Sequence, residues 1–302
     1  NTPNVTLTHY KAIKKHKKLQ LQLILESSAI LTRYGSVDRI IKKDGFKIDE
    51  MIYTVIEGEN PSTMSKSAGL AVIELTTIFG KLKPDIVLTI ADRYETLPIA
   101  MVATYMNIPL AHTQGGEVTG SIDESVRHAT TKLAHIHFPA TKKSAINLLK
   151  LGEDPKNIHM TGCPSIDLIK GLDLSINQKF INKYKIHGVG PNIDISKDYI
   201  VVLQHPVTTE YGNGLKQITE TINAVKDLDI NIIWLWPNVD AGSDSISNGL
   251  RTFRESQKLK RIKFYKNFEP EDYLRLMNNS LCIVGNSSSA IREASYLGVP
   301  AV

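Results

Sequence analysis

Short apolar runs alternate along the chain with stretches in which apolar residues recur every three or four positions. Residues 86–90 and 262–265 have the length and composition of buried strands, whereas residues 270–278 have the period of an amphipathic helix and the longer apolar stretch 96–106 is also predicted to be a helix. The connections between such segments are short. This order of elements is typical of βαβ units, so we expect an α/β fold with parallel sheets.

The alternation weakens between residues 165 and 198, where one helix-like piece and a Gly- and Pro-containing turn occur, and then resumes. We therefore predict two Rossmann-like domains facing a cleft, formed by residues 1–170 and 171–302. Within them we expect a strand at residues 158–161 and a single last helix over residues 289–297. The usual opening strand and ligand loop are not evident, so we expect the sequence to be incomplete at its start.

Composition narrows the class of protein only modestly. The 302 residues carry a formal net charge of +5, and the basic run at residues 11–18 fits a solvated helix face better than a nucleic-acid site. No apolar run is long enough to span a bilayer, so we expect no membrane partner.

Cys163 and Cys282 lack metal-like spacing, which favours free thiols in a reducing cytoplasm. Neither a zinc pattern nor a Walker loop occurs, and we expect no metal and no cofactor.

Residues 112–128 predict a strand, a glycine-rich turn and a helix start. Gly115 and Gly116 allow positive φ and a close approach of ligand to backbone, and Ser121 with Glu124 fits a capping box. Four charged or titratable side chains gather at this corner: Glu117, Asp123, Arg127 and His128. Asp123 and Arg127 lie one helical turn apart, so the alternative interpretation is a capped helix with an exposed ion pair.

Chemically useful residues follow several predicted strands. Asp92 and Arg93 end one strand and His112 ends the next, and ligands of parallel sheets bind at such carboxyl ends. In the second half, the loop at residues 285–289 is the best candidate phosphate site, and Glu293 could accept hydrogen bonds from a ribose. His205 and Asn238 follow two other strands. Each has a structural alternative, namely helix caps for the serines, a solvated glutamate, a structural histidine and a turn asparagine.

Several of these motifs, taken in order, resemble those of the hydrolysing UDP-N-acetylglucosamine 2-epimerases of sialic-acid and related nonulosonic-acid pathways. The resemblance rests on Asp92-Arg93, on the 112–128 segment, on Gly162-Cys163-Pro164-Ser165, on the segment from Gln204 to Thr209, on Pro237-Asn238, and on Gly285-Asn286-Ser287-Ser288. It implies a glycosyltransferase-B type fold that binds a UDP-sugar, a cytoplasmic location, and a homodimer or homotetramer. It also implies that the sequence is truncated at its other end, and hence at both ends.

Carried over by position, the resemblance assigns two sets of residues. The implied UDP contacts are Arg93, His205, Asn238, Ser287, Ser288 and Glu293. The implied sugar and catalytic positions are Asp92, Gln114, Glu117, Asp123, Arg127 and His128. The implied reaction converts UDP-N-acetylglucosamine to N-acetylmannosamine and UDP by anti elimination to a 2-acetamidoglucal, followed by addition of water.

Gln114 departs from the pattern, because many members of this family carry a glutamate there and an amide cannot transfer protons. Three possibilities follow: Asp92, Glu117 and Asp123 perform the proton transfers, the substrate differs, or turnover is impaired. The second substrate that we consider is a UDP-2,4-diacetamido-2,4,6-trideoxyglucose, as in legionaminic-acid type pathways. A glycosyltransferase of the same fold and a UDP-sugar-binding protein without turnover are further alternatives.

Overall fold

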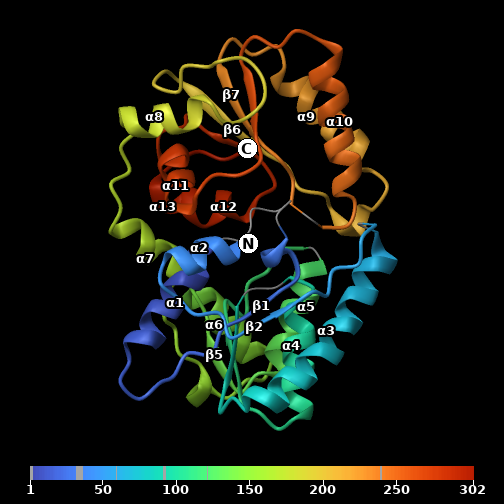
Figure 1. The fold of residues 1–302 in the computed structure, drawn as a ribbon, viewed down its shortest axis with the longest axis vertical. Helices are drawn as coiled ribbons and strands as arrows, with labels where there is room; N and C mark the ends of the chain where they lie inside the picture. The colour runs from blue at the N-terminus through green and yellow to red at the C-terminus, as the bar shows by residue number, and fades with distance from the viewer. Residues whose placement is uncertain (1–2, 32–36, 59, 91–92, 121, 239) are drawn as a thin grey trace. The chain divides into compact units, whose positions relative to one another are not determined.

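The computed structural model describes residues 3–31, 37–58, 60–90, 93–120, 122–238 and 240–302 (Figure 1). The chain divides into two compact units, Asn1–Pro164 and Ser165–Val302, so the division falls between Pro164 and Ser165, whereas we predicted it after residue 170. Each unit has its own parallel sheet and its own hydrophobic core. In the part of the chain that the structure describes, no helix has both the length and the apolar character required to cross a membrane.

Helices and strands alternate through the first unit. Its elements are α1 (Pro3–Lys15), β1 (Ile24–Glu26), η1 (Ser27–Ile30), α2 (Val37–Lys43), β2 (Glu50–Ile52), α3 (Pro61–Leu82), β3 (Val87–Ile90), α4 (Thr96–Tyr105), β4 (Leu110–Thr113), α5 (Ile122–Leu133), β5 (Ile136–Phe138), α6 (Lys142–Lys150) and η3 (Pro155–Asn157). Strand β1 pairs in parallel with β2, and β3, β4 and β5 form a parallel sheet in that order. The carboxyl ends of β3 and β4 are therefore neighbours.

The core of the first unit forms where apolar helix faces cover these strands. Leu75 and Phe79 of α3 and Ala100 of α4 are buried against Val87 and Leu110 of the sheet. Helix α3 begins with a capping box in which the Asn60 side chain accepts from the Thr63 backbone N–H and the Thr63 hydroxyl accepts from that of Asn60. These contacts fix the scaffold from which the strand ends project.

The second unit repeats the alternation. Its elements are α7 (Pro164–Lys170), α8 (Gln178–Lys185), β6 (Tyr199–Leu203), η4 (Thr208–Glu210), α9 (Gly214–Val225), β7 (Asn231–Leu235), α10 (Ser243–Ser256), β8 (Ile262–Tyr265), α11 (Pro270–Asn278), β9 (Ile283–Gly285), α12 (Ser288–Ile291) and α13 (Glu293–Leu297). The four strands are parallel in the order β8-β7-β6-β9. Strands β7, β6 and β9 therefore bring three carboxyl ends side by side.

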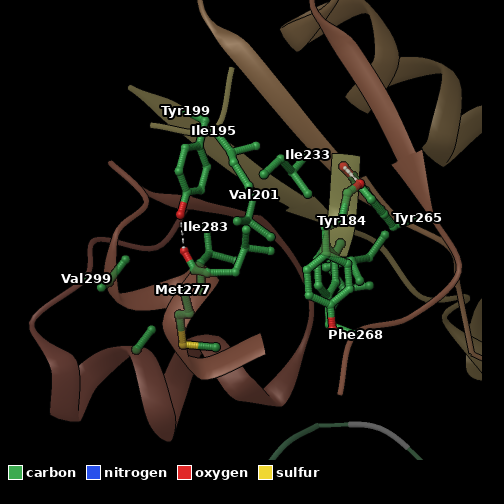
Figure 2. Close-up of a cluster of buried hydrophobic side chains, with 14 of the residues drawn as sticks. Tyr184, Ile195, Tyr199, Val201, Ile233, Tyr265, Phe268, Met277, Ile283 and Val299 are labelled. Carbon is green, nitrogen blue, oxygen red and sulfur yellow. Dashed lines mark hydrogen bonds between the residues drawn. The ribbon is translucent and has the colours of Figure 1, made fainter. Parts of the chain in front are cut away.

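Both faces of this sheet are buried, which explains why its strands are almost entirely apolar. Tyr199, Val201 and Leu203 of β6 face α8, α11 and α13, whereas Ile200 and Val202 face α9 and α10 (Figure 1). Figure 2 shows the first of these clusters, where the Tyr199 hydroxyl donates to the Leu276 carbonyl at 2.7 Å. The buried phenol is thus satisfied without leaving the core.

Three predictions about elements were wrong or incomplete. Residues 158–161 form no strand, although a single bridge joins Ile158 to His137 beside β5. The predicted last helix is two short helices, α12 and α13, which meet at Arg292. The stretch where we expected one helix-like piece contains two helices, α7 and α8. The signal for α8 in the sequence is its N-cap residue Asn177, whose side chain accepts from the Phe180 N–H at 3.0 Å.

Candidate functional site

The turn after β4 is shaped by close packing against α6. Gln114 has a φ of +61° and Gly116 a φ of +80°. A Cβ added to Gly116 would lie 2.2 Å from the Ser144 carbonyl oxygen, and the Asn147 side-chain amide donates to the Gly116 carbonyl at 2.8 Å. We predicted that these glycines admit a ligand, but the close approach at Gly116 is to the backbone of α6.

Arg127 holds the same turn from the side of α5. Its side chain is fully buried, and its Nη1 donates to the Glu117 carbonyl at 2.7 Å and to the Thr119 hydroxyl at 3.4 Å. The alternative of an exposed ion pair with Asp123 is therefore wrong for the arginine. A buried guanidinium on a backbone carbonyl fixes the path of residues 117–119.

Two of the candidate groups, Gln114 and Glu117, lie in this turn, and Asp123 lies in the first turn of α5. Glu117 and Asp123 are half-buried, whereas the Gln114 side chain is buried, with its Nε2 3.8 Å from the Cys163 Sγ. The turn therefore presents two carboxylates and one buried amide. Carboxylates can accept and return protons, and the amide can only orient a neighbour.

Glu124 and His128 form a second small group at the start of α5. The Glu124 carboxylate accepts from the N–H groups of Thr119 and Gly120 at 2.8 and 2.6 Å, and these hydrogen bonds lower its pKa. His128 Nε2 lies 3.6 Å from Glu124 Oε1. Ser121, the other half of the predicted capping box, lies outside the described residues.

At the end of β3, Asp92 lies outside the described residues, and Arg93 begins the next described segment. The Arg93 Nη2 lies 3.3 Å from Glu95 Oε1, and both side chains are largely buried. Because β3 and β4 are adjacent parallel strands, Arg93 and Gln114 follow neighbouring strand ends of one sheet.

In the second unit, the ends of β6, β7 and β9 are joined by hydrogen bonds around His205. The Asn286 side chain accepts from the His205 N–H at 2.7 Å and donates to its carbonyl at 2.9 Å. The Asn238 N–H donates to His205 Nδ1 at 3.1 Å. In the neutral ring the proton therefore resides on Nε2, which makes that nitrogen a donor.

The serines after β9 form a compact hydroxyl cluster. Ser287 caps α12 and accepts from the Ser289 N–H at 3.3 Å, and the Ser289 hydroxyl lies 2.8 Å from that of Tyr273. Ser288 is the exposed first residue of the four-residue α12. Since this helix is so short, hydroxyl and N–H donors, not a long helix dipole, are what this loop offers an anion.

Glu293 is buried, which excludes the alternative of a solvated helix glutamate. Its side chain is 3% exposed and burial raises its pKa, although a hydrogen bond from Ser165 opposes that rise. A buried carboxylate of this kind can accept hydrogen bonds from vicinal hydroxyls.

Two residues of these strand ends escaped the sequence analysis. Asn286 was noted only within its loop, and Glu95 was not considered, because nothing in the sequence indicates that Asn286 joins His205 or that Glu95 turns toward the end of β1. Pairs of this kind join residues far apart in the chain, for example 81 positions for Asn286 and His205.

Comparison with known proteins identifies the family of the chain. A family profile described as UDP-N-acetylglucosamine 2-epimerase matches residues 11–302. The UDP-N,N'-diacetylbacillosamine 2-epimerase (hydrolyzing) of Legionella pneumophila is 30% identical over 292 residues, which are 97% of this chain and 75% of that protein. The UDP-N-acetylglucosamine 2-epimerase of Neisseria meningitidis serogroup B is 29% identical over 290 residues, 96% of this chain and 73% of that protein.

Among solved structures, UDP-GlcNAc 2-epimerase from Neisseria meningitidis bound to UDP-GlcNAc has a TM-score of 0.77 at 18% identity, covering 99% of this chain and 78% of that one. Two α/β units with parallel sheets and polar strand ends define a protein of the glycosyltransferase-B fold type, as the sequence analysis predicted. The chain belongs to the UDP-N-acetylglucosamine 2-epimerase family.

Proposed function

We propose that the protein is a hydrolysing 2-epimerase, which converts UDP-N-acetylglucosamine to N-acetylmannosamine and UDP. The observation that carries the proposal is the turn after β4, where the buried Arg127 holds the backbone of Glu117 and Asp123 follows at the start of α5. The chemistry requires a carboxylate base held close to a weakly acidic C2–H, and such a turn provides one. Family membership and the two relatives, both named 2-epimerases, support the same class of reaction.

In the proposed reaction, a carboxylate among Asp92, Glu117 and Asp123 removes the C2 proton. The electron pair of the C–H bond forms a C1=C2 double bond while the C1–O bond to UDP breaks. Water then adds to C1 of the 2-acetamidoglucal, and a proton is delivered to C2 on the opposite face. A pair of neighbouring carboxylates allows one to act as base while the other is protonated and acts as acid. Arg127 sets the position of Glu117, and Gln114 and His128 orient the sugar.

UDP is proposed to be bound by Arg93, His205, Asn238, Ser287, Ser288 and Glu293. The departing diphosphate gains negative charge, which favours hydrogen-bond donors already in position. His205 suits this role because the Asn238 N–H occupies its Nδ1 and leaves Nε2 as the donor. The buried Glu293 is suited to accept from the ribose hydroxyls.

A second substrate is favoured by the relative from Legionella pneumophila, which is named a UDP-N,N'-diacetylbacillosamine 2-epimerase. This is the 2,4-diacetamido-2,4,6-trideoxy sugar that we consider from the sequence. The elimination involves only C1 and C2, so both substrates fit one mechanism. A comparison of kcat/KM for the two nucleotide sugars decides between them.

The test is a proton NMR time course in deuterium oxide with each UDP-sugar in turn. We expect free UDP and a manno-configured sugar that carries deuterium at C2. Asp123→Asn should slow product release about 100-fold or more, and Asp85→Asn, which alters an exposed aspartate of the same unit, should leave the rate unchanged. Binding of UDP without deuterium incorporation into either sugar would contradict the epimerase proposal and favour a UDP-sugar-binding protein. Transfer of the sugar to an acceptor would indicate a glycosyltransferase.

A further inference from the structure

A buried hydrogen bond joins the ends of β1 and β3 in the first unit. The Ser27 hydroxyl donates to Glu95 Oε1 at 2.7 Å, and both residues are buried, at 4% and 9% exposure. Ser27 directly follows β1 and has a φ of +58°, a conformation that costs free energy for a residue other than glycine. The local backbone is therefore held so that this hydroxyl meets Glu95.

The same carboxylate oxygen also contacts Arg93. Arg93 Nη2 lies 3.3 Å from Glu95 Oε1, and the arginine side chain is only 15% exposed. The Tyr94 ring supports both groups, since its centroid lies 5.9 Å from the Arg93 Cζ and its hydroxyl lies 3.4 Å from the Ser27 Oγ. A single oxygen thus receives a hydroxyl from one side and a guanidinium from the other.

Helix capping does not account for this arrangement. Glu95 is the N-cap residue of α4, yet its side chain makes no capping hydrogen bond to that helix. Its second oxygen, Oε2, is buried and has no hydrogen-bond partner among the described residues. Glu26, another acidic residue, lies close enough that the charge of Glu95 adds to burial in raising the pKa of the Glu26 carboxyl group. A buried acid that neither caps its helix nor is fully satisfied is costly for a purely structural role.

The geometry points to Glu95 as a positioning residue for Arg93, held in place in turn by Ser27. The inference rests on the proposed function, in which Arg93 contacts UDP. A long arginine side chain loses rotamer freedom when it binds a ligand, and fixing it beforehand reduces that loss. Ser27 and Glu95 then act on UDP binding through Arg93 and without touching the nucleotide.

The test is a double-mutant cycle on UDP binding, measured by calorimetry on the full chain. Glu95→Gln keeps the shape of the side chain and removes its charge. In the native background we expect it to weaken UDP binding about tenfold, or about 1.4 kcal/mol. In an Arg93→Ala background we expect about twofold or less, because the residue through which Glu95 acts is gone.

The control is Glu74→Gln, the same change at an exposed position of α3, which should leave the dissociation constant unchanged. An equal loss in both backgrounds, or no loss in the native one, would overturn the inference while leaving the proposed function intact. Failure of the unmodified protein to bind UDP would contradict both the inference and the proposed function. If Glu95→Gln does not fold, as judged by circular dichroism, Ser27→Ala replaces it in the same cycle and decides by the same criterion.

Discussion

Glu26, at the end of β1, carries a carboxyl group whose pKa is raised to about 8, first by burial and then by the charge of Glu95. The folded protein therefore binds a proton at Glu26 at pH values where the unfolded chain, with an ordinary pKa of 4.5, has released it. Stability from this group is present at low pH and is lost as the pH rises from about 4.5 to about 8.

We predict that Glu26→Gln removes this loss. The difference in free energy of unfolding between the variant and the unmodified protein should grow by about 4 kcal/mol in favour of the variant between pH 5 and pH 8.5. Urea unfolding followed by far-UV circular dichroism at several pH values measures it. Glu74→Gln, at an exposed site, should give a curve parallel to that of the unmodified protein; parallel curves for Glu26→Gln would contradict the prediction.

At the residue scale, the sequence indicates which residue types occupy the strand ends but not what each of them contacts. The strand, turn and helix around residues 112–128 follow from spacing alone. Two other features depend on tertiary packing that no local pattern encodes. Arg127 is buried and donates to the Glu117 carbonyl, and Gly116 packs closely against the backbone of α6. The bond from Ser27 to Glu95 spans 68 positions and has no sequence signal. The roles of the predicted site residues remain predictions.

Asp272 shows how one residue joins two helices of the second unit. This buried carboxylate on α11 accepts from the Lys183 Nζ at 2.6 Å and the Tyr184 hydroxyl at 2.7 Å, both on α8, and from the Arg275 Nη1 at 2.6 Å. Burial alone would raise its pKa, but these partners, Lys183 foremost, lower it below the ordinary value. The attachment of α8 to α11 therefore depends on the charge of Asp272.

We predict that Asp272→Asn destabilises the second unit by about 2–4 kcal/mol, because a buried network loses its charge. Both tryptophans of the chain, Trp234 and Trp236, lie in this unit, so tryptophan fluorescence during guanidinium unfolding reports on it. Asp167→Asn, in an exposed pair with Lys170, should cost about 0.5 kcal/mol or less.

The difference between Asp272→Asn and the unmodified protein should also depend on pH. A carboxyl group with a lowered pKa stabilises the fold above its ordinary value of 3.8, and that contribution is lost as the pH falls further through the folded pKa. The two unfolding curves should therefore converge in acid. A difference that is constant from pH 7 to pH 3 would show that shape, not charge, attaches α8.

At the scale of elements, prediction from sequence succeeds where local signals agree. Strand β8 and helix α11 fall at the predicted residues, because an apolar run and a Pro-initiated helix follow each other directly. It fails at residues 158–161, where only one bridge to β5 forms among the described residues, and at Arg292, where α12 ends and α13 begins. These outcomes depend on neighbouring elements, which the local pattern does not contain.

At the scale of the whole molecule, each unit has a separate core, while the proposed UDP contacts are divided between them. Arg93 belongs to the first unit, and His205, Asn238, Ser287, Ser288 and Glu293 belong to the second. A ligand that binds only the native state stabilises whatever part of the protein must be folded to bind it. The unfolding of each unit therefore reports separately on whether that unit takes part in binding.

We predict that UDP at 100 times its dissociation constant stabilises both units. The free energy of an unfolding transition that destroys the UDP site should rise by about 2.7 kcal/mol at 25 °C. Thermal unfolding followed by tryptophan fluorescence reports the second unit, and far-UV circular dichroism reports both. In Arg93→Ala, UDP should still raise the midpoint seen by tryptophan fluorescence, and the remaining circular dichroism transition should no longer move. If UDP shifts only the tryptophan transition of the unmodified protein, Arg93 takes no part in nucleotide binding, and the assignment of this arginine to UDP is wrong.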